Sequence, residues 1–385
     1  MPLLRIAPIL VAAAAGILAA SSGTASTWHV PSDAPTIQAG IDSAVVGDTV
    51  LVAPGTYTGS GNRDISFLGK NIVVLSEAGA ASTTIDAQSG AGNPHRGFFI
   101  ASGEGLGAVL DGFTIVRGYM GTRPGAIAAP GLPRTEHDLS GGGIKCQDAS
   151  PTLRNLVLRD CGSEYTGGGL DFELFAQPVV FNCVIEGCFA GFQGGGITIE
   201  TASNPTIRDC TVTGCTALFG GGIGCSAEAT IINCIVAGNA SASTPRWPGV
   251  PYGAAVAVIY PGRPLFQRVI VGNNCAPDGA GEIFIDDGGI LAFGCSVFDP
   301  ATIVTNGSGA WSAASLNVAG RPAFCFPLDC GRAPTVGGDY HLQVGSPGLA
   351  ATSPCGQDIG PLGQGCVAQT RVEGVSWGRV KGLYR

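Results

Sequence analysis

The stretch Gly141-Gly142-Gly143-Ile144 decides the fold, because it returns along the chain at nearly constant steps. It recurs as Gly167-Gly168-Gly169-Leu170, Gly194-Gly195-Gly196-Ile197 and Gly220-Gly221-Gly222-Ile223, at steps of 26, 27 and 26 residues. Looser copies follow at 253–256 and 280–283. A fixed period of this size is typical of one supersecondary unit stacked on copies of itself. The sequence therefore predicts a solenoid.

Each glycine triplet is followed by a short stretch in which apolar residues alternate with variable ones. The apolar pairs are Ile144/Cys146, Leu170/Phe172, Ile197/Ile199, Ile223/Cys225, Val256/Val258 and Ile283/Ile285. Period-two alternation predicts a strand with one buried face. Helices are excluded because a glycine triplet would interrupt each of them. We therefore expect short strands whose apolar sides line the interior of a coil.

Equivalent positions of successive copies hold like residues, as stacking in register requires. The sets are Cys161/Cys188/Cys215, Cys183/Cys210/Cys234 and, at a coil corner, Asn155/Asn182/Asp209/Asn233. With neighbouring strands about 4.8 Å apart, each set becomes a ladder of touching side chains. The corner residues are expected to bond to backbone groups exposed by the bend.

The 14 cysteines leave two interpretations open for the ladders. Ladder cysteines have a spacing compatible with disulfides between coils, and they equally suit a reduced, packed core. Local disulfides are expected in the less regular end of the chain, at Cys325/Cys330 and Cys355/Cys366.

These properties resemble those of the right-handed parallel β-helix proteins of the pectin-lyase-like superfold. The resemblance covers most of residues 28–366. Residues 35–44 resemble the short amphipathic helix that caps the first coil, and residues 339–342, 346–347 and 358–360 resemble the closing coil. The resemblance implies an all-β fold, namely a right-handed parallel β-helix with a short N-terminal capping helix.

The chain divides into three parts. Residues 1–25 are predicted to be a signal peptide, with Arg5 ahead of an apolar run of 15 residues. Residues 26–366 form the predicted β-helix, with regular coils over about 95–290 and a less regular closing part over 291–366. Residues 367–385 are a basic tail, either a sorting signal or a frayed end. We expect a secreted or cell-surface protein with no membrane span in the mature chain.

Two Gly/Pro-rich loops, 119–140 and 240–251, interrupt the repeat. Long loops on a rigid solenoid often shape a binding groove, and they also arise by tolerated drift.

Charge and motifs exclude several functional classes. The net charge of −8, without a basic stripe, argues against nucleic-acid binding. No cysteine or histidine cluster has zinc spacing, and no calcium-binding nonapeptide is present. We therefore expect no metal and no cofactor, with calcium at clustered carboxylates left open.

Those carboxylates alternate with the apolar residues of the triplet strands. Stacking would bring Asp171, Glu173 and Glu200 onto one outward face, with Lys145 beside them. This face is the candidate ligand-binding site, and clustered carboxylates can bind cations or raise one another's pKa. The alternative is an ordinary solvated surface.

Three fragments are also similar to motifs of the pectin methylesterases, namely residues 147–149, 169–175 and 262–264. The resemblance implies Asp171 as nucleophile, Asp148 as general acid and base, and Arg263 as the residue that orients the substrate carboxylate. The chain departs from the family pattern where Leu265 replaces the tryptophan after Gly262-Arg263-Pro264, and Arg263 lies about one coil too far downstream.

The sequence favours an exported β-helix repeat protein without catalysis, in contact with a polysaccharide or a cell-surface glycan. The first alternative is a carbohydrate-active enzyme of the same superfold, either a pectin esterase or a polysaccharide lyase. The second is a purely structural surface spacer. Binding would favour exposed aromatic rings, and the candidates are Tyr165, Phe189, Phe192 and Phe219, which could equally pack as a ladder in the turns.

Overall fold

The computed structural model describes residues 24–90, 92–121, 139–200, 202–245, 248–277, 279–314 and 316–366. The predicted signal peptide up to residue 23, most of the loop 119–140 and the tail 367–385 lie outside the described residues.

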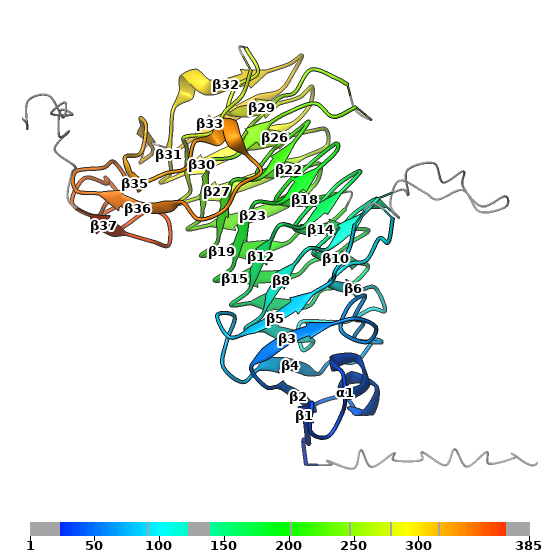
Figure 1. Cartoon of the computed structure of the whole chain (residues 1–385). Helices are drawn as coiled ribbons and strands as arrows, with labels where there is room; N and C mark the ends of the chain where they lie inside the picture. The colour runs from blue at the N-terminus through cyan, green and yellow to red at the C-terminus, as the bar shows by residue number, and fades with distance from the viewer. Residues whose placement is uncertain are drawn as a thin grey trace, which may run out of the picture.

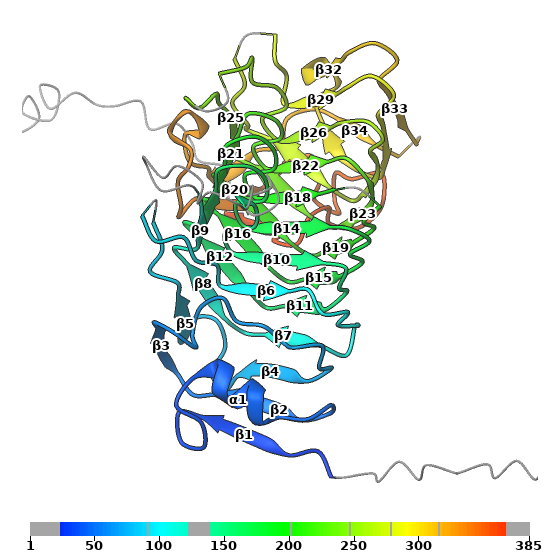
Figure 2. The same cartoon turned by 90° about the vertical axis from the view of Figure 1, so that its right-hand side faces the viewer.

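The chain winds into a tower of stacked coils whose strands form parallel sheets (Figure 1). The sheet that we call the front sheet has the order β6 (Phe98–Ile100), β10 (Ile144–Gln147), β14 (Leu170–Glu173), β18 (Ile197–Ile199), β22 (Ile223–Cys225), β26 (Val256–Val258), β29 (Ile283–Ile285) and β32 (Ile303–Thr305). Figure 2 shows these strands stacked up the tower. The glycine triplets precede β10, β14, β18 and β22, and the looser copies precede β26 and β29.

Two further sheets complete the wall of the tower. The long sheet has the order β1 (Thr27–Val30), β2 (Thr49–Val52), β4 (Val73–Ser76), β7 (Val109–Asp111), β11 (Thr152–Arg154), β15 (Val179–Phe181), β19 (Thr206–Arg208), β23 (Glu228–Ile232), β27 (Arg263–Gln267), β30 (Ile290–Gly294) and β33 (Ala310–Ala313). The side sheet has the order β3 (Gly55–Thr58), β5 (Thr83–Asp86), β8 (Thr114–Val116), β12 (Val157–Arg159), β16 (Val184–Glu186), β20 (Thr211–Thr213), β24 (Ile235–Ala237), β28 (Ile270–Gly272), β31 (Val297–Phe298) and β34 (Val318–Ala319).

A smaller parallel sheet, the turn sheet, joins the side sheet to the front sheet. Its order is β9 (Tyr119–Met120), β13 (Gly162–Ser163), β17 (Phe189–Ala190), β21 (Thr216–Ala217) and β25 (Ala240–Ser241). One coil therefore runs through β10, β11, β12 and β13 before β14 begins the next. The expected right-handed parallel β-helix is confirmed.

The glycine triplets are turns in which successive coils touch through their backbones. A Cβ atom on Gly168 would lie 2.3 Å from the carbonyl oxygen of Phe189 and 2.4 Å from that of Gly195. The same conflict recurs at Gly142, Gly195 and Gly221. Because no side chain fits in this space, the triplet is a steric requirement of coil stacking.

The asparagine corner forms the expected ladder. Asn155, Asn182, Asp209 and Asn233 all adopt a positive φ between 53° and 56°, a region that asparagine and aspartate tolerate better than other side chains. Their side chains bond along the ladder: Asn182 Nδ2 donates to Asn155 Oδ1 at 2.7 Å, and Asn233 Nδ2 donates to Asp209 Oδ1 at 2.7 Å. The corner is thus held by bonds between coils as well as by local geometry.

A helix covers the N-terminal end of the tower, and a small sheet packs on its flank near the C-terminal end. The helix α1 (Ile37–Ser43), N-capped by Thr36, buries Ile37, Gly40 and Ile41 over the first coils and confirms the predicted capping helix. At the other end, a closing sheet of β35 (Phe324–Phe326), β36 (Asp339–Gln343) and β37 (Gln364–Cys366) packs against the outside of the side sheet. Two short 3-10 helices follow in chain order: η2 (Pro300–Thr302) lies between β31 and β32, and η3 (Cys330–Arg332) lies between β35 and β36.

The disulfide pairs expected within the closing part are wrong. Three disulfides join Cys275 to Cys330, Cys295 to Cys355, and Cys325 to Cys366. The first two connect coil corners to residues 320–366, which we call the closing segment and which fold back against the tower. The pairing therefore fixes the closing segment to the coils, which local pairs would not do.

The other eight cysteines, all within the described residues, have free and buried thiols. The ladders Cys161/Cys188/Cys215 and Cys183/Cys210/Cys234 belong to this group, so the reduced, packed alternative is the one that the structure adopts. Burial raises the pKa of Cys225 to about 12, which suppresses the reactive thiolate.

None of the thiols of the native protein should react with a water-soluble thiol reagent in the absence of reductant, because the free thiols are all buried. After denaturation without reductant, eight thiols should titrate. A smaller number would show that ladder cysteines are paired.

Gly168→Ala should destabilise the protein by about 2 kcal/mol or more, because the new Cβ overpacks two backbone carbonyls. The measurement is the shift in the urea unfolding midpoint. Gly320→Ala is the matched control, since no atom lies within 4 Å of a Cβ built there, and a similar shift in both variants would contradict the steric account.

Candidate functional site

The predicted carboxylate face lies on the outer side of the front sheet, and Lys145, Asp171 and Glu173 are buried there, so the alternative of an ordinary solvated surface is wrong. Lys145 is 1% exposed, Asp171 0% and Glu173 1%. The first glycine of each triplet turns back over the strand that follows: Gly167, at φ 64°, would place a Cβ only 2.4 Å from the Cβ of Asp171. The turn itself therefore helps to cover the outward side chains.

The four predicted ligand-binding residues meet in one cluster, in which Lys145, Asp171 and Glu173 are buried and Glu200 is half-buried. Lys145 and Asp171 are directly opposite in the parallel pairing of β10 with β14. Lys145 Nζ lies 2.9 Å from Glu173 Oε1 and 3.4 Å from Asp171 Oδ2. The chain thus buries one ammonium group between two carboxyl groups of the next coil.

Asp171 has the most unusual environment in the cluster. Within the described residues, its Oδ2 atom makes no hydrogen bond, while Oδ1 accepts a long one from Thr166 Oγ1 at 3.5 Å. Burial raises the pKa of Asp171 well above its ordinary value, the Lys145 charge opposes this, and Glu173 and Glu200 add to it. Burial therefore favours the neutral form of Asp171.

The cluster is a poor calcium site. Carboxylate oxygens of Asp171, Glu173 and Glu200 lie within 4.8 Å of one another, which is the grouping that a cation would need. However, Glu173 already forms an ion pair with the Lys145 ammonium group. A calcium ion here would have to face that ammonium, so the residues present do not fit it.

The structure does not assemble the esterase-like residues. Asp148 is exposed in the turn after β10, where its amide bonds to the carbonyl oxygens of Glu173 and Leu174. Arg263 begins β27 in the long sheet, opposite Glu228. That position lies three coils beyond Asp171, roughly 14 Å along the tower. Arg263 therefore cannot orient a substrate at Asp171.

The aromatic residues of the turns pack against one another. Tyr165 and Phe192 stack with ring centroids 5.3 Å apart, and Phe192 meets Phe219 edge-on at 5.4 Å. Phe219 continues to Tyr252 at 6.2 Å. These rings face their neighbours in the stack and are half-buried, so they pack as a ladder in the turns instead of forming an exposed binding surface.

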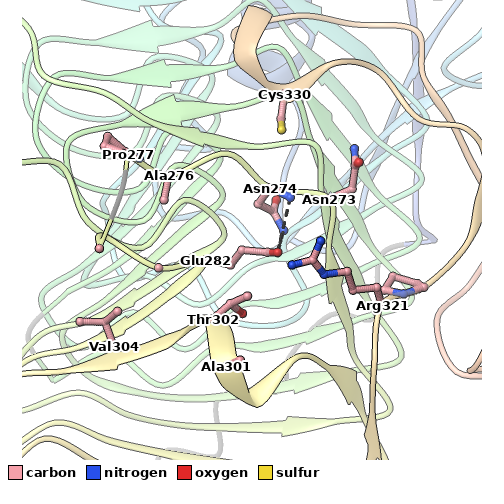
Figure 3. A pocket seen from close by; sticks show the side chains of 13 residues that line it. Asn273, Asn274, Ala276, Pro277, Glu282, Ala301, Thr302, Val304, Arg321 and Cys330 are labelled. Atoms are coloured by element: carbon pink, nitrogen blue, oxygen red, sulfur yellow. Dashed lines mark hydrogen bonds between the residues drawn. The ribbon is translucent and has the colours of Figure 1, made fainter.

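A polar cavity that the sequence analysis did not identify lies between the last coils and the closing segment (Figure 3). It measures about 500 Å³. Its polar lining comes from Asn273 and Asn274 at a coil corner, Glu282 before β29, Thr302 of η2 and Arg321 of the closing segment. The Cys275–Cys330 disulfide joins two of these segments at the cavity wall. We call this the Glu282 pocket.

Glu282 is the acidic group of this pocket. Its Oε2 atom accepts a hydrogen bond from Asn274 Nδ2 at 2.9 Å, and Asn274 in turn bonds to Asn239 inside the coils. Burial raises the pKa of Glu282, against the opposing effects of Asn274 and Arg321. Arg321 reaches toward it from the closing segment and pairs with Asp299 at 3.3 Å.

One sequence signal pointed to this site. Glu282 stands where the earlier copies have the third glycine of the triplet, in Ala280-Gly281-Glu282-Ile283. A glutamate in place of a sterically required glycine marks a coil whose surroundings differ. Arg321 gave no such signal, because only the packing of the closing segment brings it to the pocket.

The comparison with protein families agrees with the fold. Residues 134–274 match a family model described as the right handed beta helix region. Among solved structures, pectate lyase Pel9A is 12% identical with a TM-score of 0.49, over 89% of this chain and 97% of that one. An alginate lyase from Paenibacillus sp. str. FPU-7 is 12% identical with a TM-score of 0.41, over 76% of this chain and 99% of that one. No curated protein matches the sequence.

Similarity at this level carries no argument about activity. In the described part of the chain, no helix is long and apolar enough to cross a membrane.

The raised pKa of Glu282 has a predictable effect on stability. Because the native state holds this proton more tightly than the unfolded state, the free energy of unfolding should fall as pH rises from the ordinary value of 4.5 through the raised one. Glu282→Gln should reduce this slope. Urea unfolding at several pH values above about 4 measures it, with Glu228→Gln as control, and an unchanged slope in Glu282→Gln would contradict the assignment.

Proposed function

We propose that the chain is an exported, non-catalytic β-helix protein that binds a polysaccharide or cell-surface glycan in the Glu282 pocket. The observation behind this proposal is the convergence of Glu282, Asn273, Thr302 and Arg321 around one cavity of about 500 Å³. This volume lies within the range of small-molecule sites, and amide, hydroxyl and charged groups are suited to the hydroxyl-rich surface of a sugar.

The charges of the pocket favour an acidic sugar. The Arg321 side chain is 78% exposed, so its guanidinium can reach a ligand while it pairs with Asp299. A guanidinium recognises a carboxylate through paired, charge-assisted hydrogen bonds. A uronic acid residue of a polysaccharide offers such a carboxylate beside its hydroxyl groups.

Two features support export and a binding role. Three disulfides are typical of proteins that fold in an oxidising compartment. The Lys145–Asp171–Glu173 cluster, which contains the candidate nucleophile Asp171, is buried away from any polymer outside the coils. A substrate must contact the groups that act on it.

The second candidate is a carbohydrate-active enzyme, and one observation favours it. A carboxylic acid with a raised pKa, such as Glu282, can donate a proton to a leaving group. Under this alternative the same pocket would cleave or de-esterify a polysaccharide. Product formation therefore separates the two candidates.

The test is calorimetric titration of the purified protein with oligomers of galacturonate and of alginate, with a neutral glucan as the reference ligand. We expect an acidic oligomer to bind and Arg321→Ala to weaken its binding about tenfold or more, since a hydrogen bond to a charged group contributes about 1.5–3 kcal/mol. Arg263→Ala, on another groove of the tower, should leave the affinity unchanged.

The same incubations, and one with methyl-esterified galacturonate oligomers, are assayed for new reducing ends, unsaturated products and released methanol. Binding without products supports the proposal, and products that disappear in Glu282→Gln would establish the enzyme instead. If none of the oligomers binds, the proposal is wrong, and the interpretation of the chain as a structural surface spacer remains.

A further inference from the structure

The buried Lys145 amine lies against a carboxyl group with which it can react. Lys145 Nζ is 3.4 Å from Asp171 Oδ2, an oxygen bonded to the Cγ atom that the amine would attack, so the two groups are in direct contact. Both side chains are fully covered, and they come from residues directly opposite in adjacent strands. The backbone ladder of the front sheet therefore holds a nucleophile and an electrophile together without water.

The two carboxyl groups in the cluster have different surroundings. Glu173 Oε1 accepts a hydrogen bond from Lys145 Nζ at 2.9 Å, so it is placed to take a proton from the ammonium group. Asp171 Oδ2 has no hydrogen-bond partner in the described part of the chain, and Thr166 Oγ1 points at the other oxygen, Oδ1. These positions suit Glu173 as a proton carrier and Asp171 as the group attacked.

We propose that Lys145 and Asp171 form an intramolecular isopeptide bond that joins β10 to β14 covalently, with Glu173 as the proton carrier. The Lys145 ammonium first gives a proton to Glu173. The amine nitrogen then attacks Cγ of the neutral Asp171 carboxyl group, whose Oδ1 is polarised by Thr166. Glu173 takes a second proton from nitrogen as it delivers the first to Oδ2, and Oδ2 leaves as water.

The step balances without any other reactant. One N–C bond forms, one C–O bond breaks, and one water molecule is released, while no atom is oxidised or reduced. Burial raises the pKa of Asp171 and so favours its neutral form, and a neutral carboxyl group is open to attack where a carboxylate repels a nucleophile.

The product also relieves an unfavourable arrangement. A buried ammonium between two carboxyl groups has a large desolvation cost. The isopeptide removes the charge of Lys145 and leaves a neutral amide, with Glu173 protonated. The bond would close a loop of 26 residues between positions 145 and 171 and tie two successive coils together, which suits a surface protein exposed to proteases.

The experiment is mass spectrometry of the full chain after reduction and alkylation of its cysteines. We expect an intact mass lower by one water than the sequence requires. Trypsin should fail to cleave after Lys145, because an acylated lysine is not a substrate, and the peptide ending at Arg154 should remain joined to the peptide 160–208. Fragmentation should place the link between Lys145 and Asp171.

Glu173→Gln should restore the full mass and cleavage after Lys145, because glutamine cannot carry the proton. Glu228→Gln, a matched change on the exposed part of β23, should keep the link. A wild-type protein of full mass with Lys145 cleaved by trypsin overturns the proposal, and so does a link to Glu173. If Glu173→Gln does not fold, the wild-type peptide map alone decides the question.

Discussion

The close approach of one coil's backbone to the next at the glycine triplets is the constraint on which the rest of the structure depends. At Gly168 the space for a side chain is filled by carbonyl oxygens of two neighbouring segments. Every ladder in the tower, whether of cysteine, asparagine or aromatic rings, requires this register to be kept from coil to coil. The triplet therefore fixes the stacking, and the side chains follow from it.

The same constraint decides where chemistry can occur. By turning back over the outside of the front sheet, the triplets help to enclose Lys145, Asp171 and Glu173, which removes them from polymeric substrates and leaves them facing one another. The repeat lapses at Glu282, and there an open polar pocket forms beside the closing segment. A buried reactive cluster and an open binding site thus occupy separate parts of one tower.

The sequence was sufficient to predict the β-helix, the capping helix and the asparagine corner, because each depends on residues that repeat or lie close together in the chain. It correctly grouped Lys145 with Asp171 and Glu173, since strand register alone brings them together. Their burial could not be predicted, because it arises from how the turns fold back. The Glu282 pocket and the disulfides also escaped prediction, since both depend on the packing of a closing segment some 40 to 60 residues away in sequence.

Hydrogen exchange at the triplet amides tests the central claim most directly. The amide of Gly168 bonds to Gly194 O at 3.2 Å, and that of Gly221 bonds to Gly253 O at 3.2 Å, so these glycines belong to the hydrogen-bonded wall. The account predicts that peptides spanning the triplets exchange as slowly as the strands of the front sheet. Rapid exchange at the triplets, with protection confined to the strands, would show that they are ordinary exposed turns and would contradict it.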